Sequence, residues 1–175
     1  KNLLYKNETV ADAAPDAIAA AQDFCEGYKT FLDEGKIERE CVTYTIAQAE
    51  TAGFRPLVRG EKLQAGDKVY YNNRGKSVML AVIGQESLAQ GAVIGAAHID
   101  SPRLDLKQNP LYEDKEMAYC KTHYYGGIKK YQWVTIPLEL HGKIVRADGS
   151  EIYVKIGADP EDPQFVINDL LPHLG

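Results

Sequence analysis

Apolar residues recur at three- and four-residue spacing early in the chain, and this spacing limits the possible folds more than any other feature. Between Ala14 and Gly35 they fall on one face of a helix. A second pattern of the same kind runs from Ile37 to Ala52, and Gly53 follows it as a stop signal. The sequence therefore predicts two consecutive helices that form a helical hairpin.

Strand signals replace the helical pattern beyond Gly53. Apolar residues at 69–71 and 77–83 flank a polar turn, and this arrangement predicts a β-hairpin. The run 92–97 holds only small and apolar residues. Such a run is typical of a strand buried on both faces, in a sheet covered by helices. A short buried helix segment is the alternative for the same run.

The chain after Pro102 is rich in Tyr, Thr, Ile and Val, and turn residues divide it into strand-like segments. The segments expected as strands are 117–125, 131–141, 143–146 and 151–156. The sequence thus predicts an α/β fold in two parts. A mixed helix-and-sheet part covers residues 1–104, and a β-rich part covers residues 105–175.

The composition excludes several classes of protein. With 175 residues and 45% hydrophobic content, the chain is long enough for a packed core, so disorder is not expected. A net charge of −5 gives no overall positive field to attract nucleic acid. No apolar stretch approaches the roughly 20 residues of a membrane span. Three cysteines without a C-x-x-C pair, and an N-terminus without secretory features, predict a cytoplasmic protein.

The residues best suited to chemistry lie in the segment Gly95–Pro102, where His98 and Asp100 stand two positions apart. Side chains at i and i+2 of a strand lie on the same face, so we expect these two to touch. An imidazole binds a metal through one ring nitrogen while a carboxylate holds the other. His98 is therefore a candidate metal ligand and Asp100 its partner. A pair that serves only the structure is the other interpretation.

The run Ala96–Leu104 resembles the Gly-x-His-Thr-Asp-Ser-Pro signature of the M18 metallo-aminopeptidases, with Ile99 in place of the usual threonine. Four further segments agree with that family: Glu26–Leu32, Glu38–Glu40, Ala52–Phe54 and Tyr125–Gly127. The similarity extends over most of the chain.

The resemblance implies a catalytic α/β domain into which a β-rich dimerisation domain is inserted. Residues 1–104 would be the N-terminal part of the first and residues 105–175 part of the second. It implies two divalent metal ions, generally zinc, with cobalt or manganese as alternatives. By position in the motif, His98 matches a metal ligand, and Asp100 has the catalytic role of orienting it. The implied substrate is a peptide, and the implied assembly is a homo-oligomer, a tetrahedral dodecamer.

The sequence contains three other histidines, His123, His141 and His173. His173 lies in Leu170–Leu174, which resembles a segment that carries a histidine into the active site of a neighbouring subunit. The resemblance gives His173 a catalytic role in holding substrate or stabilising a developing oxyanion; a histidine that caps a buried loop is the alternative. His123 is expected on a strand face and His141 in a turn, and neither receives a catalytic role.

The remaining ligands of the family are not found in this sequence. In the family a bridging aspartate, a Glu-Glu pair and a last histidine follow the inserted domain, and the chain contains no Glu-Glu pair. A tetrahedral zinc site needs three or four protein ligands. We therefore expect the 175 residues alone to be an inactive piece of a metal-dependent aminopeptidase. The alternative is a non-catalytic binding or oligomerisation module with a structural His98–Asp100 pair.

Overall fold

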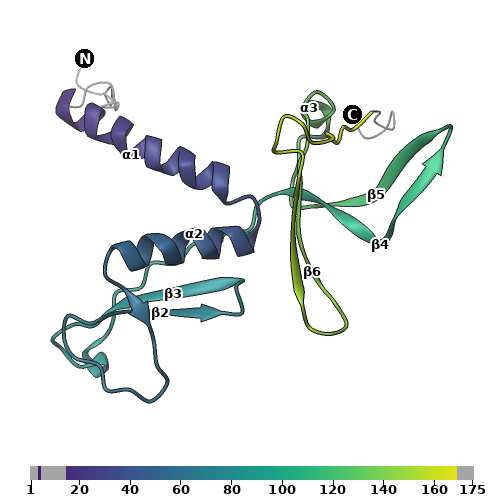
Figure 1. Cartoon of the computed structure of the whole chain (residues 1–175). Coiled ribbons are helices and arrows are strands. Elements are labelled where there is room, and N and C mark those ends of the chain that lie inside the picture. The colour runs from purple at the N-terminus through teal and green to yellow at the C-terminus, as the bar shows by residue number, and fades with distance from the viewer. Residues whose placement is uncertain (1–3, 5–14, 169–175) are drawn as a thin grey trace. The chain divides into compact units, whose positions relative to one another are not determined.

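The computed structural model describes residue 4 and residues 15–168 of the chain (Figure 1). Its internal contacts divide the chain into two compact units, Lys1–Ala96 and Ala97–Gly175, called unit 1 and unit 2 below. Among the described residues, unit 1 contains two α-helices and a small sheet, and unit 2 contains two β-hairpins and one short helix.

Unit 1 begins with two helices, α1 (Pro15–Glu34) and α2 (Glu38–Thr51), so both predicted helices are confirmed. The connection between them is tight at Gly35. A Cβ atom on Gly35 would lie 2.9 Å from Sγ of Cys41, closer than real side chains approach. A glycine is therefore required where the chain reverses between the helices.

Side chains near this connection fix the start of α2. The carboxylate of Glu40 accepts hydrogen bonds from the backbone N–H groups of Lys36 and Ile37, at 3.0 and 3.3 Å. These donors precede the helix, so the glutamate satisfies groups that the helix itself cannot. Phe31 and Tyr44 pack edge to face with 5.5 Å between ring centroids and join the two helices.

A three-stranded sheet follows in the order β1-β2-β3. The strand β1 (Arg55–Pro56) pairs in parallel with β2 (Lys68–Asn73), and β2 pairs antiparallel with β3 (Ser77–Val82). The predicted hairpin is therefore confirmed. Its turn contains Gly75 with φ of 67°, a backbone conformation that glycine adopts without steric cost.

The core of unit 1 lies between α2 and the β2–β3 hairpin, which run side by side in Figure 1. The buried side chains come from α2 and β2: Cys41, Val42, Ala49, Val69 and Tyr70. The hydroxyl of Tyr70 also donates a 2.7 Å hydrogen bond to the carboxylate of Glu50 on α2. Apolar packing and polar contacts such as this one thus hold the helix on the sheet.

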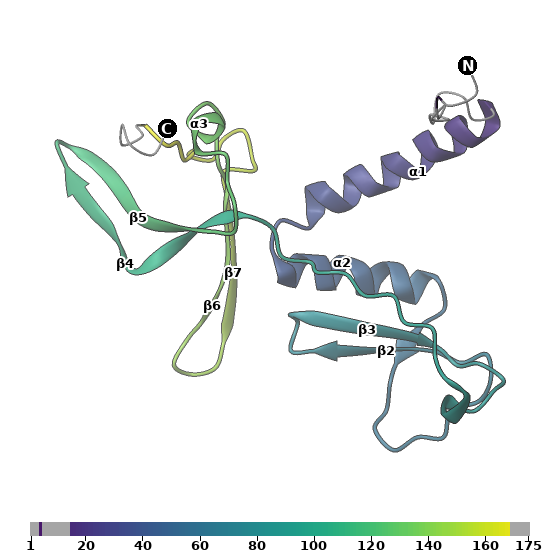
Figure 2. The same ribbon diagram turned by 180° about the vertical axis from the view of Figure 1, so that it is seen from behind.

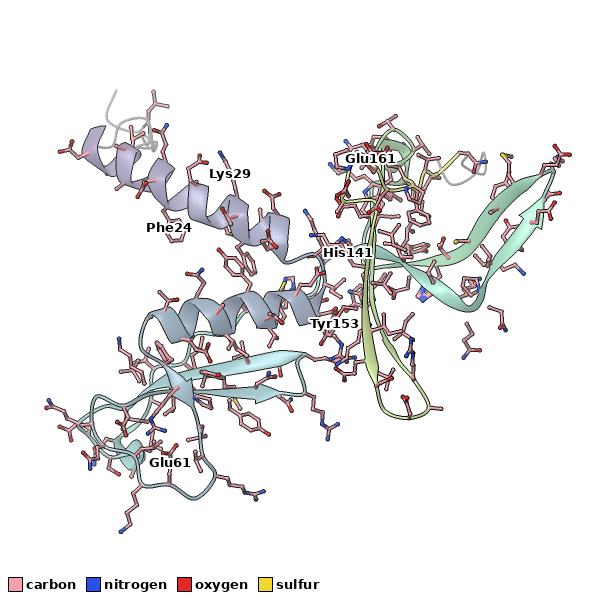
Figure 3. The ribbon with its side chains drawn as sticks, in the orientation of Figure 1. Phe24, Lys29, Glu61, His141, Tyr153 and Glu161 are labelled. Carbon is pink, nitrogen blue, oxygen red and sulfur yellow. The ribbon has the colours of Figure 1, made fainter. Side chains whose placement is uncertain are left out.

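The apolar face of α1 is much less covered. Figure 3 shows the side chain of Phe24 projecting from the helix, and 76% of its surface is exposed. Tyr28 and Leu32 are exposed as well. Neither α1 nor any other helix in the described part of the chain has the length and apolar content needed to cross a membrane.

The predicted buried strand at 92–97 is wrong for this structure. Residues 92–97 form neither a strand nor a helix, and the side chains of Val93 and Ile94 are exposed. A strand in the interior of a sheet needs hydrogen-bonded neighbours on both sides. No strand among the described residues pairs with this run, so composition alone does not make it part of a sheet.

Unit 2 contains a long antiparallel hairpin of β4 (Arg103–Asp114) and β5 (Met117–Tyr125), shown from behind in Figure 2. The sequence predicted β5 with these bounds but missed β4. The register shifts between Leu106 and Leu111, which marks an irregular bulge in β4. The hairpin is thus continuous at its two ends and interrupted between them.

A second antiparallel hairpin joins β6 (Leu140–Val145) and β7 (Glu151–Ile156), and β7 has the predicted bounds. The strand expected over 131–141 is wrong for most of its length. Its first residues belong to the short helix α3 (Lys130–Trp133), closed by hydrogen bonds from Gln132 and Trp133 to the carbonyl of Lys129. Pro137 follows, and proline cannot donate to a strand ladder.

Candidate metal-binding site

His98 and Asp100 lie in unit 2, in the segment that leads into β4. That segment is irregular and not a strand. The register of the β4–β5 hairpin sets Tyr125, the last residue of β5, opposite Arg103, the first residue of β4. Strand pairing therefore brings the end of β5 beside the histidine-aspartate segment.

The expected contact between His98 and Asp100 is confirmed. Nδ1 of His98 lies 3.0 Å from the carbonyl oxygen of Asp100 and 3.2 Å from its carboxylate Oδ1. A carbonyl oxygen and an ionised carboxylate only accept hydrogen bonds, so both contacts require the proton on Nδ1. This tautomer leaves the lone pair of Nε2 available to a ligand.

Tyr125 completes the arrangement from the other strand. Its hydroxyl donates a 2.8 Å hydrogen bond to Oδ2 of Asp100, so each carboxylate oxygen has its own partner. The hydrogen bond from Tyr125 holds the pKa of the Asp100 carboxyl below its ordinary value, and the backbone N–H of Asp100 and then His98 act in the same direction. Asp100 is therefore ionised at neutral pH and can keep His98 in the Nδ1–H tautomer.

Arg103 fixes the ring of Tyr125. The guanidinium carbon lies 4.2 Å from the centroid of the ring, a cation–π distance. Nε of Arg103 donates to Oδ1 of Asp105 at 2.8 Å, which orients the guanidinium. Four side chains are thus linked in sequence, from Asp105 through Arg103 and Tyr125 to Asp100.

The site is open on the side of the histidine. The side chain of His98 is 84% exposed and that of Asp100 36%. Nε2 of His98 makes no hydrogen bond to another residue in the described part of the chain. A neutral imidazole nitrogen that is accessible and held in one tautomer is a suitable ligand for zinc.

A complete metal site is not formed by the described residues. Within residue 4 and residues 15–168, no three histidine, cysteine, aspartate or glutamate side chains come together to hold an ion. His98 is a single donor, and the carboxylate of Asp100 is engaged by His98 and Tyr125. The donor set fits one ligand of a zinc site and its supporting partner.

The other histidines have different surroundings. His173 lies outside the described residues. His123 is exposed on β5, as expected, with Nδ1 3.1 Å from the carbonyl of Tyr124. His141 is not in a turn as predicted: it lies in β6, and its Nε2 contacts the carboxylate of Glu139 at 2.8 Å.

Sequence reasoning missed the part played by Tyr125 and Arg103. In the sequence, Tyr125 stands out only as the last residue of the expected strand 117–125 and as part of the Tyr125–Gly127 resemblance, and neither places it beside Asp100. The available signal was that resemblance, because nothing in the local pattern connects positions that lie 25 residues apart. A correct prediction of β4 and of its register with β5 would have placed the two side chains together.

Comparisons with known proteins identify the family to which the chain belongs. The family described as aminopeptidase I zinc metalloprotease (M18) matches residues 31–175, which include His98 and Asp100. A probable M18 family aminopeptidase 1 from Clostridium acetobutylicum is 56% identical over 151 residues, covering 84% of this chain and 32% of that protein.

Two solved structures have the same fold. The crystal structure of aminopeptidase I from Borrelia burgdorferi matches with a TM-score of 0.84 and 39% identity, covering 91% of this chain and 40% of the solved chain. An M18-family aminopeptidase from Thermotoga maritima matches with a TM-score of 0.82 and 43% identity, covering 98% of this chain and 37% of the solved chain.

The mixed helix-and-sheet fold is therefore that of a portion of an aminopeptidase I structure, as the sequence predicted. The chain belongs to the M18 peptidase family, a family of zinc metalloproteases. It spans about a third of the length of the curated relatives that it matches.

Proposed function

We propose that this sequence serves in a metal-dependent aminopeptidase that removes N-terminal residues from peptides. The observation that carries the proposal is the His98–Asp100 pair, joined at 3.2 Å within the part of the chain that matches the M18 family. The names of the relatives, probable M18 family aminopeptidases, support the reaction class. Peptide hydrolysis needs an activated water, which is the task of the metal in such enzymes.

In this proposal His98 binds a zinc ion through Nε2, and Asp100 has the supporting catalytic role. The carboxylate holds Nδ1–H, which fixes the ring orientation and raises the basicity of the ligating nitrogen. A bound zinc ion supplies Lewis-acid polarisation of the scissile carbonyl and activation of water. We further propose a dinuclear zinc centre; cobalt and manganese accept the same ligand types.

The 175 residues supply one ligand, so we propose that they are inactive alone and that the other ligands come from further sequence of the enzyme. Residues 1–104 would belong to its catalytic domain and residues 105–175 to an inserted dimerisation domain. His173 would reach the active site of a neighbouring subunit in a homo-oligomer, for which a tetrahedral dodecamer is the proposed form. The proposed location is the cytoplasm.

The test is a substitution of His98 in the full-length aminopeptidase that carries this sequence. His98→Ala removes a metal ligand, so aminopeptidase activity should be lost and the zinc content, measured by elemental analysis, should fall. His123→Ala is the matched control, because His123 is an exposed histidine of the same unit that the site does not use. It should keep both activity and zinc.

Asp100→Asn gives the second measurement. It should lower kcat/KM by roughly 10- to 100-fold, the usual cost of losing the partner of a metal ligand, while the assembly measured by light scattering stays unchanged. Full activity and full zinc content in His98→Ala would remove the histidine from the mechanism. A wild-type protein with neither zinc nor peptidase activity would favour the binding or oligomerisation module instead.

A further inference from the structure

The carboxylate of Asp100 is held from two sides by residues from different segments. Oδ1 faces Nδ1 of His98 at 3.2 Å, and Oδ2 accepts a 2.8 Å hydrogen bond from the hydroxyl of Tyr125. The torsion that rotates an aspartate carboxylate has a broad energy profile. Asp100 is also partly exposed, so water can compete for both oxygens. Its orientation toward His98 therefore needs a second anchor.

We propose that Tyr125 is a positioning residue for His98 and acts through Asp100. This inference rests on the proposed function, because it assigns Tyr125 to the support of the same metal ligand. With Oδ2 tied to the tyrosine hydroxyl, Oδ1 stays directed at Nδ1–H and Nε2 keeps one direction. Without that hydroxyl the carboxylate rotates more freely, and the imidazole keeps only its 3.0 Å contact with the carbonyl oxygen of Asp100, which holds its orientation less tightly than the two contacts together.

The position of the tyrosine hydroxyl is set by the backbone. The register of β4 and β5 sets Tyr125 opposite Arg103. The tyrosine ring therefore lies at the end of the hairpin that adjoins the segment carrying His98. The next residue, Gly126, has φ of 70°, and a Cβ there would contact Pro102 at 3.5 Å. Gly126 and Pro102 therefore lie against each other, and the two segments that carry Tyr125 and Asp100 stay adjacent.

The ring of Tyr125 is held by the positively charged side chain of Arg103. The guanidinium of Arg103 lies 4.2 Å from the ring centroid and is oriented by its 2.8 Å bond to Asp105. Tyr125 is therefore preorganised before any metal binds, and preorganised partners lose less freedom when a ligand arrives. A positioning role requires that the hairpin holds the tyrosine in place before the metal ion binds.

The neighbouring Tyr124 provides a matched control. It is a tyrosine on the same strand and also has a cation near its ring, Lys130 at 4.6 Å from the centroid. Asp100 accepts from the hydroxyl of Tyr125 and not from that of Tyr124. Removing the hydroxyl of Tyr124 thus makes the same chemical change without touching the carboxylate.

The experiment measures zinc affinity in the full-length aminopeptidase, freed of metal and titrated with zinc against a chelating indicator. Tyr125→Phe keeps the ring and its cation and removes only the hydroxyl. It should weaken zinc binding by about 10-fold, the lower end of the effect of losing a ligand's direct partner. Tyr124→Phe should leave the zinc dissociation constant unchanged.

A double-mutant cycle with Asp100→Asn tests whether the tyrosine acts through the aspartate. If it does, Tyr125→Phe adds no further loss of zinc affinity to a protein that already carries Asp100→Asn. Amide hydrogen exchange across β4 and β5 should be the same in Tyr125→Phe as in the wild type. Loss of protection over the whole hairpin would make the role structural and overturn the inference.

The outcomes separate this inference from the proposed function. If the wild type binds zinc and His98→Ala does not, but Tyr125→Phe binds like the wild type, the inference alone fails. Losses that add in the double variant overturn it as well. A wild-type protein that binds no zinc overturns the proposed function and, with it, the inference that rests on it.

Discussion

Unit 1 buries apolar side chains between α2 and a sheet, whereas none of the described apolar residues of unit 2 is buried. In unit 1 the side chain of Val42 is 1% exposed and sits in a helix-on-sheet layer. In unit 2 the described hairpins are joined by cross-strand pairs and by contacts such as the stacked rings of Tyr112 and Tyr119, 5.3 Å apart. Two-stranded hairpins without a covering layer are marginally stable in water.

The two units therefore depend on different physical contributions to stability. A helix-on-sheet layer gains stability from the volume of apolar side chains that it removes from water. A hairpin gains it from turn geometry, register and pairwise contacts along the strands. The His98–Asp100–Tyr125 arrangement lies in unit 2 and so depends on strand register, not on a core.

The largest effect is expected from a buried valine of unit 1. Val42→Ala removes packed volume and should lower the free energy of unfolding of unit 1 by about 2 kcal/mol. Val145→Ala in β6 makes the same change where the side chain is 61% exposed, and should cost less than about 0.5 kcal/mol. Native-state hydrogen exchange, read separately for α2 and β6, checks both values. Equal losses at the two positions would contradict the difference between the units.

In unit 2, a substitution in a turn should lower the stability more than the truncation of an exposed side chain does. Gly126 has φ of 70°, and a residue with a Cβ is strained there. Gly126→Ala should therefore cost about 1 kcal/mol and reduce exchange protection at the end of β5. Gly127→Ala is the control, since its φ is not in that region and nothing lies within 4 Å of the added atom. A control variant as damaging as Gly126→Ala would show that the strained turn is not the cause.

The smallest effects concern carboxylates that hold loops, one in each unit. The pKa of Glu61 is lowered by the hydrogen bond from Arg55 and then by the backbone N–H of Val58. The pKa of Asp148 is lowered by the hydroxyl and then the backbone N–H of Ser150. Figure 3 shows Glu61 on the loop that follows β1.

A lowered pKa in the folded state contributes stability above the ordinary pKa of the group, and that stability is lost as the pH falls through the folded value. Acidification from pH 7 toward pH 3 should therefore loosen both loops, at Val58 and at Ser150. Protection factors of these two amides measure the loss. In Glu61→Gln and Asp148→Asn the pH dependence should disappear from the corresponding loop alone. Persistence of the pH dependence in these variants would assign it to other groups.

Local patterns predicted the elements that local interactions form. The helices α1 and α2 follow from apolar spacing, and the strands β5 and β7 were predicted with their observed bounds. β4 was missed because Arg103–Asp114 is mostly polar and becomes a strand by pairing with β5. The run 92–97 is the opposite case: its apolar composition predicts a strand, but no described strand pairs with it.

The sequence by itself determined the two helices, the His98–Asp100 contact and the membership of the M18 family, because these depend on residues that are near neighbours or on a contiguous motif. Only the tertiary structure decided that the second oxygen of Asp100 is held by Tyr125 and that Arg103 covers the ring. Those contacts join positions that are distant in sequence. The register of two paired strands sets them, and register is a property of the folded hairpin that neither strand carries alone.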